Sequence, residues 1–243
     1  MKEFSVLLAE IPIDIKVNFD STEYFLREYI TEKKGIFGIN VTTEDIEYEK
    51  AIYRENEAKE GICSRNYPEE YLETLSLYRK IAEIMPFYNV FLMHGAAVAY
   101  EDEAYLFTAR SGVGKTTHVQ NWLKVFKDKC KIINGDKPLI KISDKCVYVC
   151  GTPWQGKENY GNNLIVPLKS ICVLKRGNEN RMAQAKYSNE ISTLLPQIYK
   201  SRDARSYSQT IELFERITRL VPLYKLECTK DKESAVIAYN MMK

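Results

Sequence analysis

One stretch of the sequence decides which fold to expect: Ala109-Arg110-Ser111-Gly112-Val113-Gly114-Lys115-Thr116-Thr117. Glycines at this spacing let the backbone come close to a phosphate group, so that backbone N–H groups can point at its oxygens. Lys115 would supply a cation for the β- and γ-phosphates, and Thr116 a hydroxyl for Mg²⁺. The preceding apolar run ends at Thr108, and an amphipathic helix begins at about Thr116. The segment therefore predicts a nucleotide-binding loop for ATP and Mg²⁺, made by Ser111 to Thr117, with a helix N-terminus adding positive charge.

The match to this loop pattern is incomplete. Ala109 stands where the strict pattern has glycine. A glycine-rich surface turn is the alternative interpretation, but it does not explain why lysine and threonine stand at the start of a helix. We therefore keep the phosphate-loop hypothesis.

Two polar residues follow apolar runs on either side of this loop. His94 comes after the run that starts at Val90, and Asp136 closes the run Cys130–Asn134. A carboxylate at the end of a strand beside a phosphate loop is where Mg²⁺ or a nucleophile's proton is usually handled. A single histidine is more often a hydrogen-bonded core residue. Placed beside Asp136, however, His94 becomes a candidate catalytic residue, and we expect the two side chains to lie close together.

The pattern of apolar residues extends the prediction outward from the loop. Asp20 with Glu23 indicates a helix cap, and residues 44–61 are charge-rich and ambiguous. The expected helices span 20–30, 68–86, 116–126, 188–199, 206–220 and 232–241. The expected strands cover 4–19, 35–41, 90–100, 105–108, 131–134, 141–150 as a hairpin, 168–175 and 223–228. The turn at 101–103 indicates a second hairpin. This order predicts an α/β fold, a mixed sheet flanked by helices, in one domain over 1–243. Within it, residues 1–89 form an α+β elaboration packed on a core at 90–243.

Composition excludes several functional classes. The 243 residues are 45% apolar and 28% charged, with a formal net charge of +2, which is typical of a soluble globular protein. A nearly neutral chain has no electrostatic footprint for nucleic acid. No apolar run is long enough for a membrane span, and no signal peptide is recognisable, so we expect a cytoplasmic protein. The six cysteines are expected to be free, and two histidines leave few partners for zinc. The sequence leaves open whether the protein forms a homo-oligomer.

Three segments together resemble a known family. Met93-His94-Gly95, the loop Ser111–Thr116 and the strand closed by Asp136 are similar to the catalytic domain of HPr kinase/phosphorylase. That domain is in turn similar to the nucleotide-binding part of ATP-dependent phosphoenolpyruvate carboxykinases. The resemblance covers residues 90–140 well. It extends to small HPr-kinase-like proteins that phosphorylate serine on a peptide, because 134–139 and 151–157 look like that branch.

The resemblance implies an ATP- and Mg²⁺-dependent kinase that phosphorylates a hydroxyl, typically serine of a peptide or protein. It implies that Asp136 accepts the hydroxyl proton and, with Thr116, ligates the metal, while His94 positions or polarises the hydroxyl. Alternatives are a nucleotide-binding regulator without turnover and a small-molecule kinase on the same fold. Two further cations are candidate catalytic residues. The stretch 151–167 is either a connecting loop or a lid in which Lys157, with Trp154 and Asn163, covers the γ-phosphate or the acceptor. Arg176 would stabilise charge on the transferring phosphate.

One departure from the family pattern concerns Lys137. In the resembled kinases two consecutive aspartates follow the loop, whereas here the second is lysine. We expect Lys137 to point outward, because the apolar run Leu139-Ile140 resumes immediately. If it pointed inward, it would lower the pKa of Asp136 and make that carboxylate a weaker base. With one carboxylate missing, we expect phosphate transfer without the reverse reaction.

Overall fold

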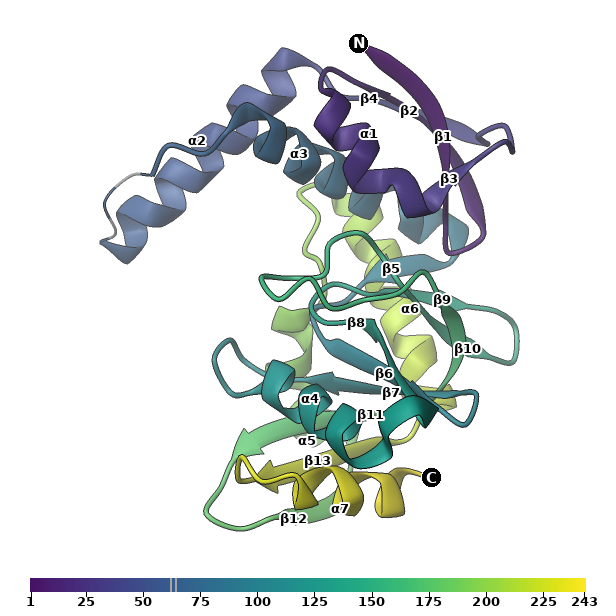
Figure 1. The fold of residues 1–243 in the computed structure, drawn as a ribbon, viewed down its shortest axis with the longest axis vertical. Coiled ribbons are helices and arrows are strands. Elements are labelled where there is room, and N and C mark those ends of the chain that lie inside the picture. Colours follow the sequence, from purple (N-terminus) through teal and green to yellow (C-terminus); the bar gives the residue numbers. More distant parts are fainter. Residues whose placement is uncertain (62, 64) are drawn as a thin grey trace. The chain divides into compact units, whose positions relative to one another are not determined.

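A computed structural model describes residues 1–61, 63 and 65–243, and in it the chain folds as two units, Met1–Ile84 and Met85–Lys243 (Figure 1). Each unit has its own β-sheet and its own helices. The chain is therefore a mixed α/β protein, as the sequence predicted. The boundary lies close to the one expected at residue 89, and the expectation that both units act as one domain stays a prediction.

The unit Met1–Ile84 combines a sheet of order β3-β1-β2-β4 with helices. β1 and β2 form an antiparallel hairpin whose turn, Ala9 and Glu10, has positive φ angles of 50° and 65°. The prediction of one continuous strand over 4–19 is wrong, because this turn contains none of the glycine, asparagine or proline residues that would have indicated it. The elements of this unit are β1 (Lys2–Leu8), β2 (Ile11–Val17), α1 (Asp20–Leu26), β3 (Ile30–Thr31), β4 (Phe37–Asn40), α2 (Thr43–Glu60) and α3 (Glu69–Ile84), with a 3₁₀ turn at Arg27–Tyr29.

The helix α1 begins without the side-chain cap predicted from Asp20. Its first turn is held instead by Glu73, a buried residue of α3. The Glu73 carboxylate accepts hydrogen bonds from the backbone N–H of Asn18 at 2.6 Å, from that of Phe19 at 3.2 Å and from the Thr22 hydroxyl at 2.5 Å. A carboxylate from a distant helix thus replaces the local cap, which the sequence around Asp20 could not reveal.

The charge-rich segment that the sequence left ambiguous is the helix α2. A capping box opens it: the Asp45 N–H donates to the Thr42 hydroxyl at 3.4 Å, and the Thr42 N–H donates to the Asp45 carboxylate at 2.9 Å. Gly61 ends the helix with a φ of 66°. Local signals at both ends therefore define this helix despite its weak apolar pattern.

The unit Met85–Lys243 contains a mixed sheet of order β5-β9-β10-β11-β7-β6-β8, with β13 beside β11 and β12 beyond β13. β7, β11 and β13 are parallel neighbours, and the other pairs are antiparallel. The strands are β5 (Val90–Leu92), β6 (Ala96–Tyr100), β7 (Glu103–Thr108), β8 (Cys130–Asn134), β9 (Leu139–Ile142), β10 (Val147–Cys150), β11 (Ile165–Arg176), β12 (Arg181–Ala185) and β13 (Leu223–Cys228). The helices are α4 (Lys115–Phe126), α5 (Tyr187–Leu194), α6 (Ala204–Leu220) and α7 (Glu233–Met242), with 3₁₀ turns at Met85–Tyr88, Lys127–Lys129 and Leu195–Gln197.

The strand pairing confirms both predicted hairpins and corrects one strand. β6 and β7 are joined through Glu101 and Asp102, and β9 pairs with β10. The apolar run at 90–100 is two strands rather than one, because β5 pairs with β9 whereas β6 pairs with β7 and β8. His94 lies between β5 and β6 and belongs to neither strand.

The helix α4 is fixed to the sheet by a cluster of aromatic side chains around Trp122. Trp122 is fully buried, and its ring centroid lies 5.0 Å from those of both Tyr105 and Phe126 and 5.5 Å from that of Phe107. Asn121 adds two hydrogen bonds to the backbone carbonyls of Lys230 and Asp231, just before α7. Because α4 begins at the predicted phosphate loop, this packing also positions the loop.

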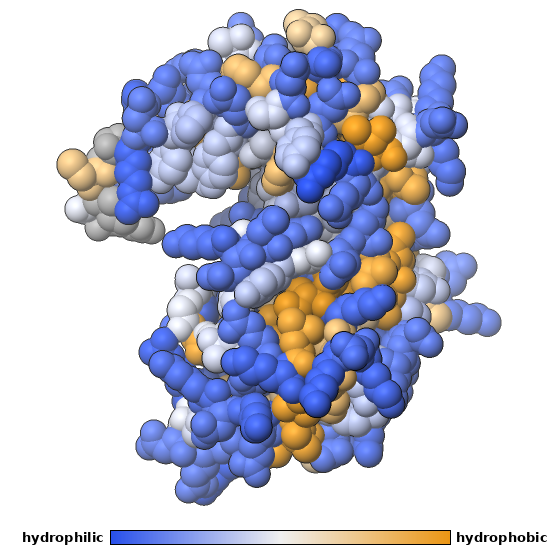
Figure 2. All heavy atoms as spheres, in the orientation of Figure 1, coloured by the Kyte–Doolittle hydropathy of each residue, from blue (hydrophilic) through white to orange (hydrophobic). Residues whose placement is uncertain are grey.

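Polar residues cover much of the face drawn in Figure 2, in keeping with a chain that is 28% charged. Within the described part of the chain, no helix combines the length and the apolar character needed to cross a membrane. Cys63, Cys130, Cys146, Cys150, Cys172 and Cys228 are free thiols, as the sequence predicted.

The buried indole of Trp122 yields a test of this packing. We expect Trp122→Ala to lower the free energy of unfolding by about 3–5 kcal/mol, because it removes buried apolar surface and leaves a cavity. Leu220→Ala, at a side chain that is 42% exposed in the same unit, is the control and should change it by less than about 0.5 kcal/mol. Urea unfolding followed by circular dichroism measures both values. A loss under about 1 kcal/mol for Trp122→Ala would contradict the anchoring role of this residue.

Candidate functional site

The segment Arg110–Gly114 forms a loop between β7 and α4, in the strand–loop–helix order that the sequence predicted. Gly112 and Gly114 have φ angles of 77° and 125°, a region that L side chains rarely adopt. The glycines therefore allow this backbone path. Ala109, where the strict pattern has glycine, has no positive φ and is fully buried, so a Cβ is tolerated there.

The amino end of α4 supplies the positive side of the loop. Gly114 is the N-cap residue, and its carbonyl accepts the first helical hydrogen bond from His118 N–H at 2.9 Å. The N–H groups of the first turn, including those of Thr116 and Thr117, have no partner within the helix and carry the positive end of its dipole. These groups are suited to an anion such as a phosphate.

The Lys115 side chain turns back onto its own loop. The residue is buried, and its amine donates to the Ala109 carbonyl at 3.0 Å. Burial lowers the pKa of Lys115, while the negative charge of Asp136 opposes this shift. The amine therefore lies against the loop backbone, close enough to the Asp136 carboxylate for the two charges to interact.

The structure brings His94 and Asp136 together. His94 Nε2 lies 3.1 Å from Asp136 Oδ1, and both side chains are partly exposed. The antiparallel pairing of β6 with β8 explains this contact, because it sets Ala97 opposite Asn134. His94 precedes the first of these residues and Asp136 follows the second, so both lie at the same edge of the sheet.

A buried asparagine fixes the backbone on which Asp136 stands. The Asn134 Oδ1 atom accepts from the N–H groups of Asp136 at 2.9 Å and Lys137 at 2.6 Å. Its amide donates to the carbonyl and the hydroxyl of Thr152, at 3.1 and 2.9 Å. On the other side lies Gly156, where an added Cβ would come within 3.0 Å of Asp136 Cβ. The position of Asp136 is therefore determined by its own turn and by the segment that contains Thr152 and Gly156.

Gln197 orients the His94 ring, and no sequence pattern indicates this role. The backbone N–H of His94 donates to the backbone carbonyl of Gln197 at 2.6 Å. In the side chains, His94 Nδ1 lies 2.9 Å from Gln197 Oε1. Gln197 is buried. Its amide can accept from Nδ1 or, when rotated, donate to it, so the contact orients the ring in both protonation states.

Lys137 points toward the site, which corrects the expectation that it points outward. Its amine lies 3.9 Å from Asp136 Oδ2. The residue is not yet in a strand, since β9 begins at Leu139, and strand alternation therefore does not apply to it. Burial raises the pKa of Asp136, but the hydrogen bond from His94 and the positive charges of Lys137, His94 and Lys115 outweigh it and lower that pKa below its ordinary value.

The other predicted site residues lie on the segment that follows Gly151 and at the end of β11. Lys157 is exposed, next to Gly156, whereas Trp154 is buried and Asn163 is exposed, so these residues do not lie together on one exposed lid. Arg176, at the end of β11, donates to the carbonyls of Gly112 and Val113. Its guanidinium is therefore bound to the loop backbone.

The second histidine, His118, is a core residue of α4. It is fully buried, and the Trp122 indole N–H donates to its Nε2 at 3.1 Å. Burial lowers the pKa of His118 to about 3, so the ring stays neutral. Among the described residues, no three His, Cys, Asp or Glu side chains gather into a metal site.

Comparison with known proteins gives little further information. The sequence matches no protein-family model and no curated protein. Among solved structures, the fold is loosely similar to the HPr(Ser) kinase/phosphatase from Coxiella burnetii, with a TM-score of 0.34 and 10% sequence identity. The similarity covers 62% of this chain and 96% of that chain. A likeness this weak carries no argument about function.

The effect of the neighbouring groups on the pKa of Asp136 can be tested by ¹³C NMR titration of its carboxyl carbon. We expect a pKa below the ordinary 3.8 in the wild type. His94→Phe, which removes the hydrogen bond, and Lys137→Met, which removes a cation, should each raise it. Lys145→Met, at an exposed lysine that does not act on Asp136, is the control. A wild-type pKa at or above 3.8 would contradict the geometry of the site.

The same shift has a consequence for stability. A carboxyl whose pKa is lower in the folded than in the unfolded chain stabilises the fold above the unfolded pKa, and this contribution is lost as pH falls through the folded pKa. The contribution of Asp136 is thus fully present at neutral pH and disappears only in acid.

Proposed function

We propose that this chain is an ATP- and Mg²⁺-dependent kinase that transfers the γ-phosphate to a hydroxyl, that of a serine in a peptide or protein. The observation that carries the proposal is the contact of His94 Nε2 with Asp136 Oδ1 at 3.1 Å, within electrostatic reach of the buried Lys115 amine. A carboxylate oriented by an imidazole beside a phosphate-binding loop is equipped to take the proton of an attacking hydroxyl.

In this proposal the loop and the start of α4 hold the nucleotide. The N–H groups from Ser111 to Thr117 bind phosphate oxygens, and Lys115 adds a point charge. The Thr116 hydroxyl and the Asp136 carboxylate are oxygen donors of the kind that Mg²⁺ takes, together with water and phosphate oxygens. When bound, the metal neutralises charge on the phosphates.

His94, Asp136 and the residues around them have separate roles in this proposal. Asp136 accepts the hydroxyl proton, His94 orients the carboxylate, and Gln197 orients His94. Lys157, on the exposed loop beside Gly156, supplies a cation toward the transferred phosphate. Arg176 stabilises the loop through the carbonyls of Gly112 and Val113 instead of acting on the phosphate.

One observation favours the alternative of a nucleotide-binding regulator without turnover. Lys137 lies 3.9 Å from Asp136 Oδ2, and the lowered pKa of Asp136 makes it a weaker base. A single-turnover experiment with γ-labelled ATP and serine-containing peptides separates the two. Label on a peptide supports the kinase, whereas tight binding of ATP with neither transfer nor hydrolysis supports the regulator.

The role of Lys115 can be tested by thermal unfolding. Ligand that binds only the folded state stabilises it by about 2.7 kcal/mol at a hundredfold excess over Kd. We expect MgATP to raise the melting temperature of the wild type and of Lys124→Ala, the control at an exposed lysine of the same helix. Lys115→Ala should lose this rise. An equal MgATP effect in Lys115→Ala would overturn the phosphate-loop assignment.

The role of Asp136 can be tested by separating binding from transfer. Asp136→Asn should keep most of the affinity for ATP but slow transfer by about 10²–10⁴-fold, the range for loss of a general base. His94→Ala should act in the same direction with a smaller effect, since it orients the base. Asp128→Asn, at an exposed carboxylate, is the control. Undiminished transfer by Asp136→Asn would show that another group takes the proton.

A further inference from the structure

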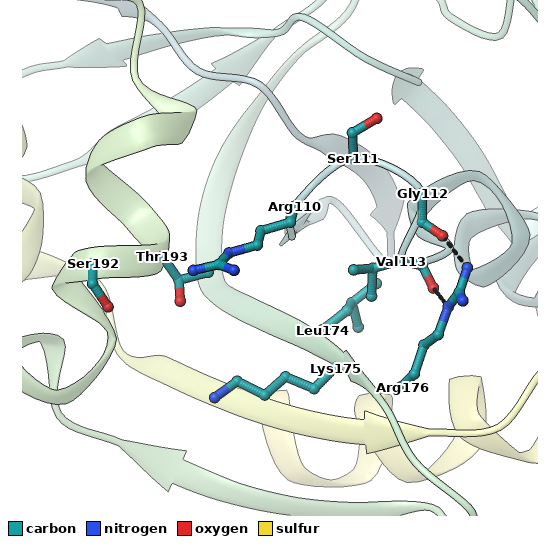
Figure 3. A pocket seen from close by; sticks show the side chains of 9 residues that line it. All are labelled: Arg110, Ser111, Gly112, Val113, Leu174, Lys175, Arg176, Ser192 and Thr193. Atoms are coloured by element: carbon teal, nitrogen blue, oxygen red, sulfur yellow. Dashed lines mark hydrogen bonds between the residues drawn. The ribbon is translucent and has the colours of Figure 1, made fainter. Parts of the chain in front are cut away.

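A cavity borders the predicted phosphate loop, and neither His94 nor Asp136 lines it. Its volume is about 680 Å³, and it is lined by loop residues Arg110 and Ser111, by Lys175 and Arg176 at the end of β11, and by Ser192 and Thr193 of α5 (Figure 3). A cavity of this size accommodates a drug-sized molecule or a short stretch of peptide. All of its lining belongs to the unit Met85–Lys243.

The lining of this cavity is positively charged. Arg110, Lys175 and Arg176 contribute cations, and the lining residues, all within the described part of the chain, include no carboxylate. The nearby Glu190 lies 3.4 Å from the Lys175 amine and offsets part of that charge. Figure 3 shows the Arg110 guanidinium directed toward Thr193, across the cavity from Arg176. The cavity is therefore suited to an anionic ligand.

The loop presents its carbonyl side to Arg176, which argues against the nucleotide phosphates as occupants. The carbonyl oxygens of Gly112 and Val113 accept from the Arg176 guanidinium. Phosphates bind the N–H groups of such a loop, because carbonyl oxygens repel them. Lys115 does not line the cavity, and no lining residue is aromatic, so there is no ring on which a nucleobase would stack.

We propose that this cavity binds carboxylate side chains of an acidic peptide, the acceptor of the phosphate, a few residues from the hydroxyl that is phosphorylated. Arginine pairs with carboxylates through two parallel hydrogen bonds, and the hydroxyls of Ser192 and Thr193 can donate further ones. Arg110 is joined to Lys115 by a short loop that spans at most about 18 Å when extended, so one peptide can reach both places. The assignment of the peptide as acceptor rests on the proposed kinase function, whereas its binding does not.

The experiment measures binding without requiring transfer. A fluorescein-labelled peptide with one serine flanked by glutamates is compared by fluorescence anisotropy with the same peptide carrying glutamines. We expect the full chain to bind the glutamate peptide at least about tenfold more tightly, with the preference weakening at 1 M salt as charges are screened. Arg110→Gln and Lys175→Gln should each remove about tenfold of affinity for the glutamate peptide, while Lys145→Gln, outside the cavity, should remove none.

Three results would overturn the proposal. The first is equal binding of the two peptides. The second is a loss of MgATP affinity in Arg110→Gln and Lys175→Gln with peptide affinity unchanged, which would assign the cavity to the nucleotide. The third is displacement of the peptide by citrate at equal concentration, which would assign it to a free carboxylate ligand.

Failure of the proposed kinase function can be distinguished from failure of the proposed binding site. If the wild type prefers the glutamate peptide but transfers no phosphate to it or to any serine peptide, the binding site stands and the kinase function does not. Asp128→Asn, at an exposed carboxylate outside the cavity, should bind the glutamate peptide as tightly as the wild type.

Discussion

The parallel pairing of β7 with β11 is the constraint on which the rest of the larger unit depends. It sets Thr108 opposite Val173, so that both strands run out at the same edge of the sheet. The loop that follows β7 then meets Arg176 at the end of β11, and the guanidinium binds the loop carbonyls. β11 also pairs with β10 through its first residues and with β13 through its last, so it joins all parts of the sheet. A shift in this register would separate the loop from the residues that support it.

The antiparallel pairing of β6 with β8 has the corresponding effect on the other side of the loop. It brings His94 and Asp136 to the same edge, and Asn134 and Gln197 then fix their orientations. These two supporting residues are buried, so their hydrogen bonds are made away from water and are costly to break. The pair is consequently held in place before any ligand arrives, which is what a site for proton transfer requires.

The loop lies between two groups of charged residues that differ in character. On the β8 side, one carboxylate, Asp136, is surrounded by Lys115, Lys137 and His94, and the pKa of Asp136 falls. On the β11 side, Arg110, Lys175 and Arg176 line a cavity without a carboxylate in its lining. In the first arrangement the basic groups outnumber the single carboxylate and keep it ionised. The second has a surplus of positive charge and suits the binding of an anion.

The sequence by itself determined the strand, loop and helix around Gly112 and Gly114, because these depend on local backbone freedom and on apolar periodicity. It also indicated His94 and Asp136 as a pair, since both follow apolar runs. Only the tertiary structure decided that Lys137 points inward, that Gln197 holds His94 and that Arg176 binds the loop. The contacts of Gln197 and Arg176 join segments that are distant in the chain, and no local pattern reveals how such segments pair. Lys137 lies before β9 begins, where the alternation of a strand does not apply. The cap on α1 by Glu73 also depends on tertiary packing, because Glu73 lies on α3, 54 residues after Phe19.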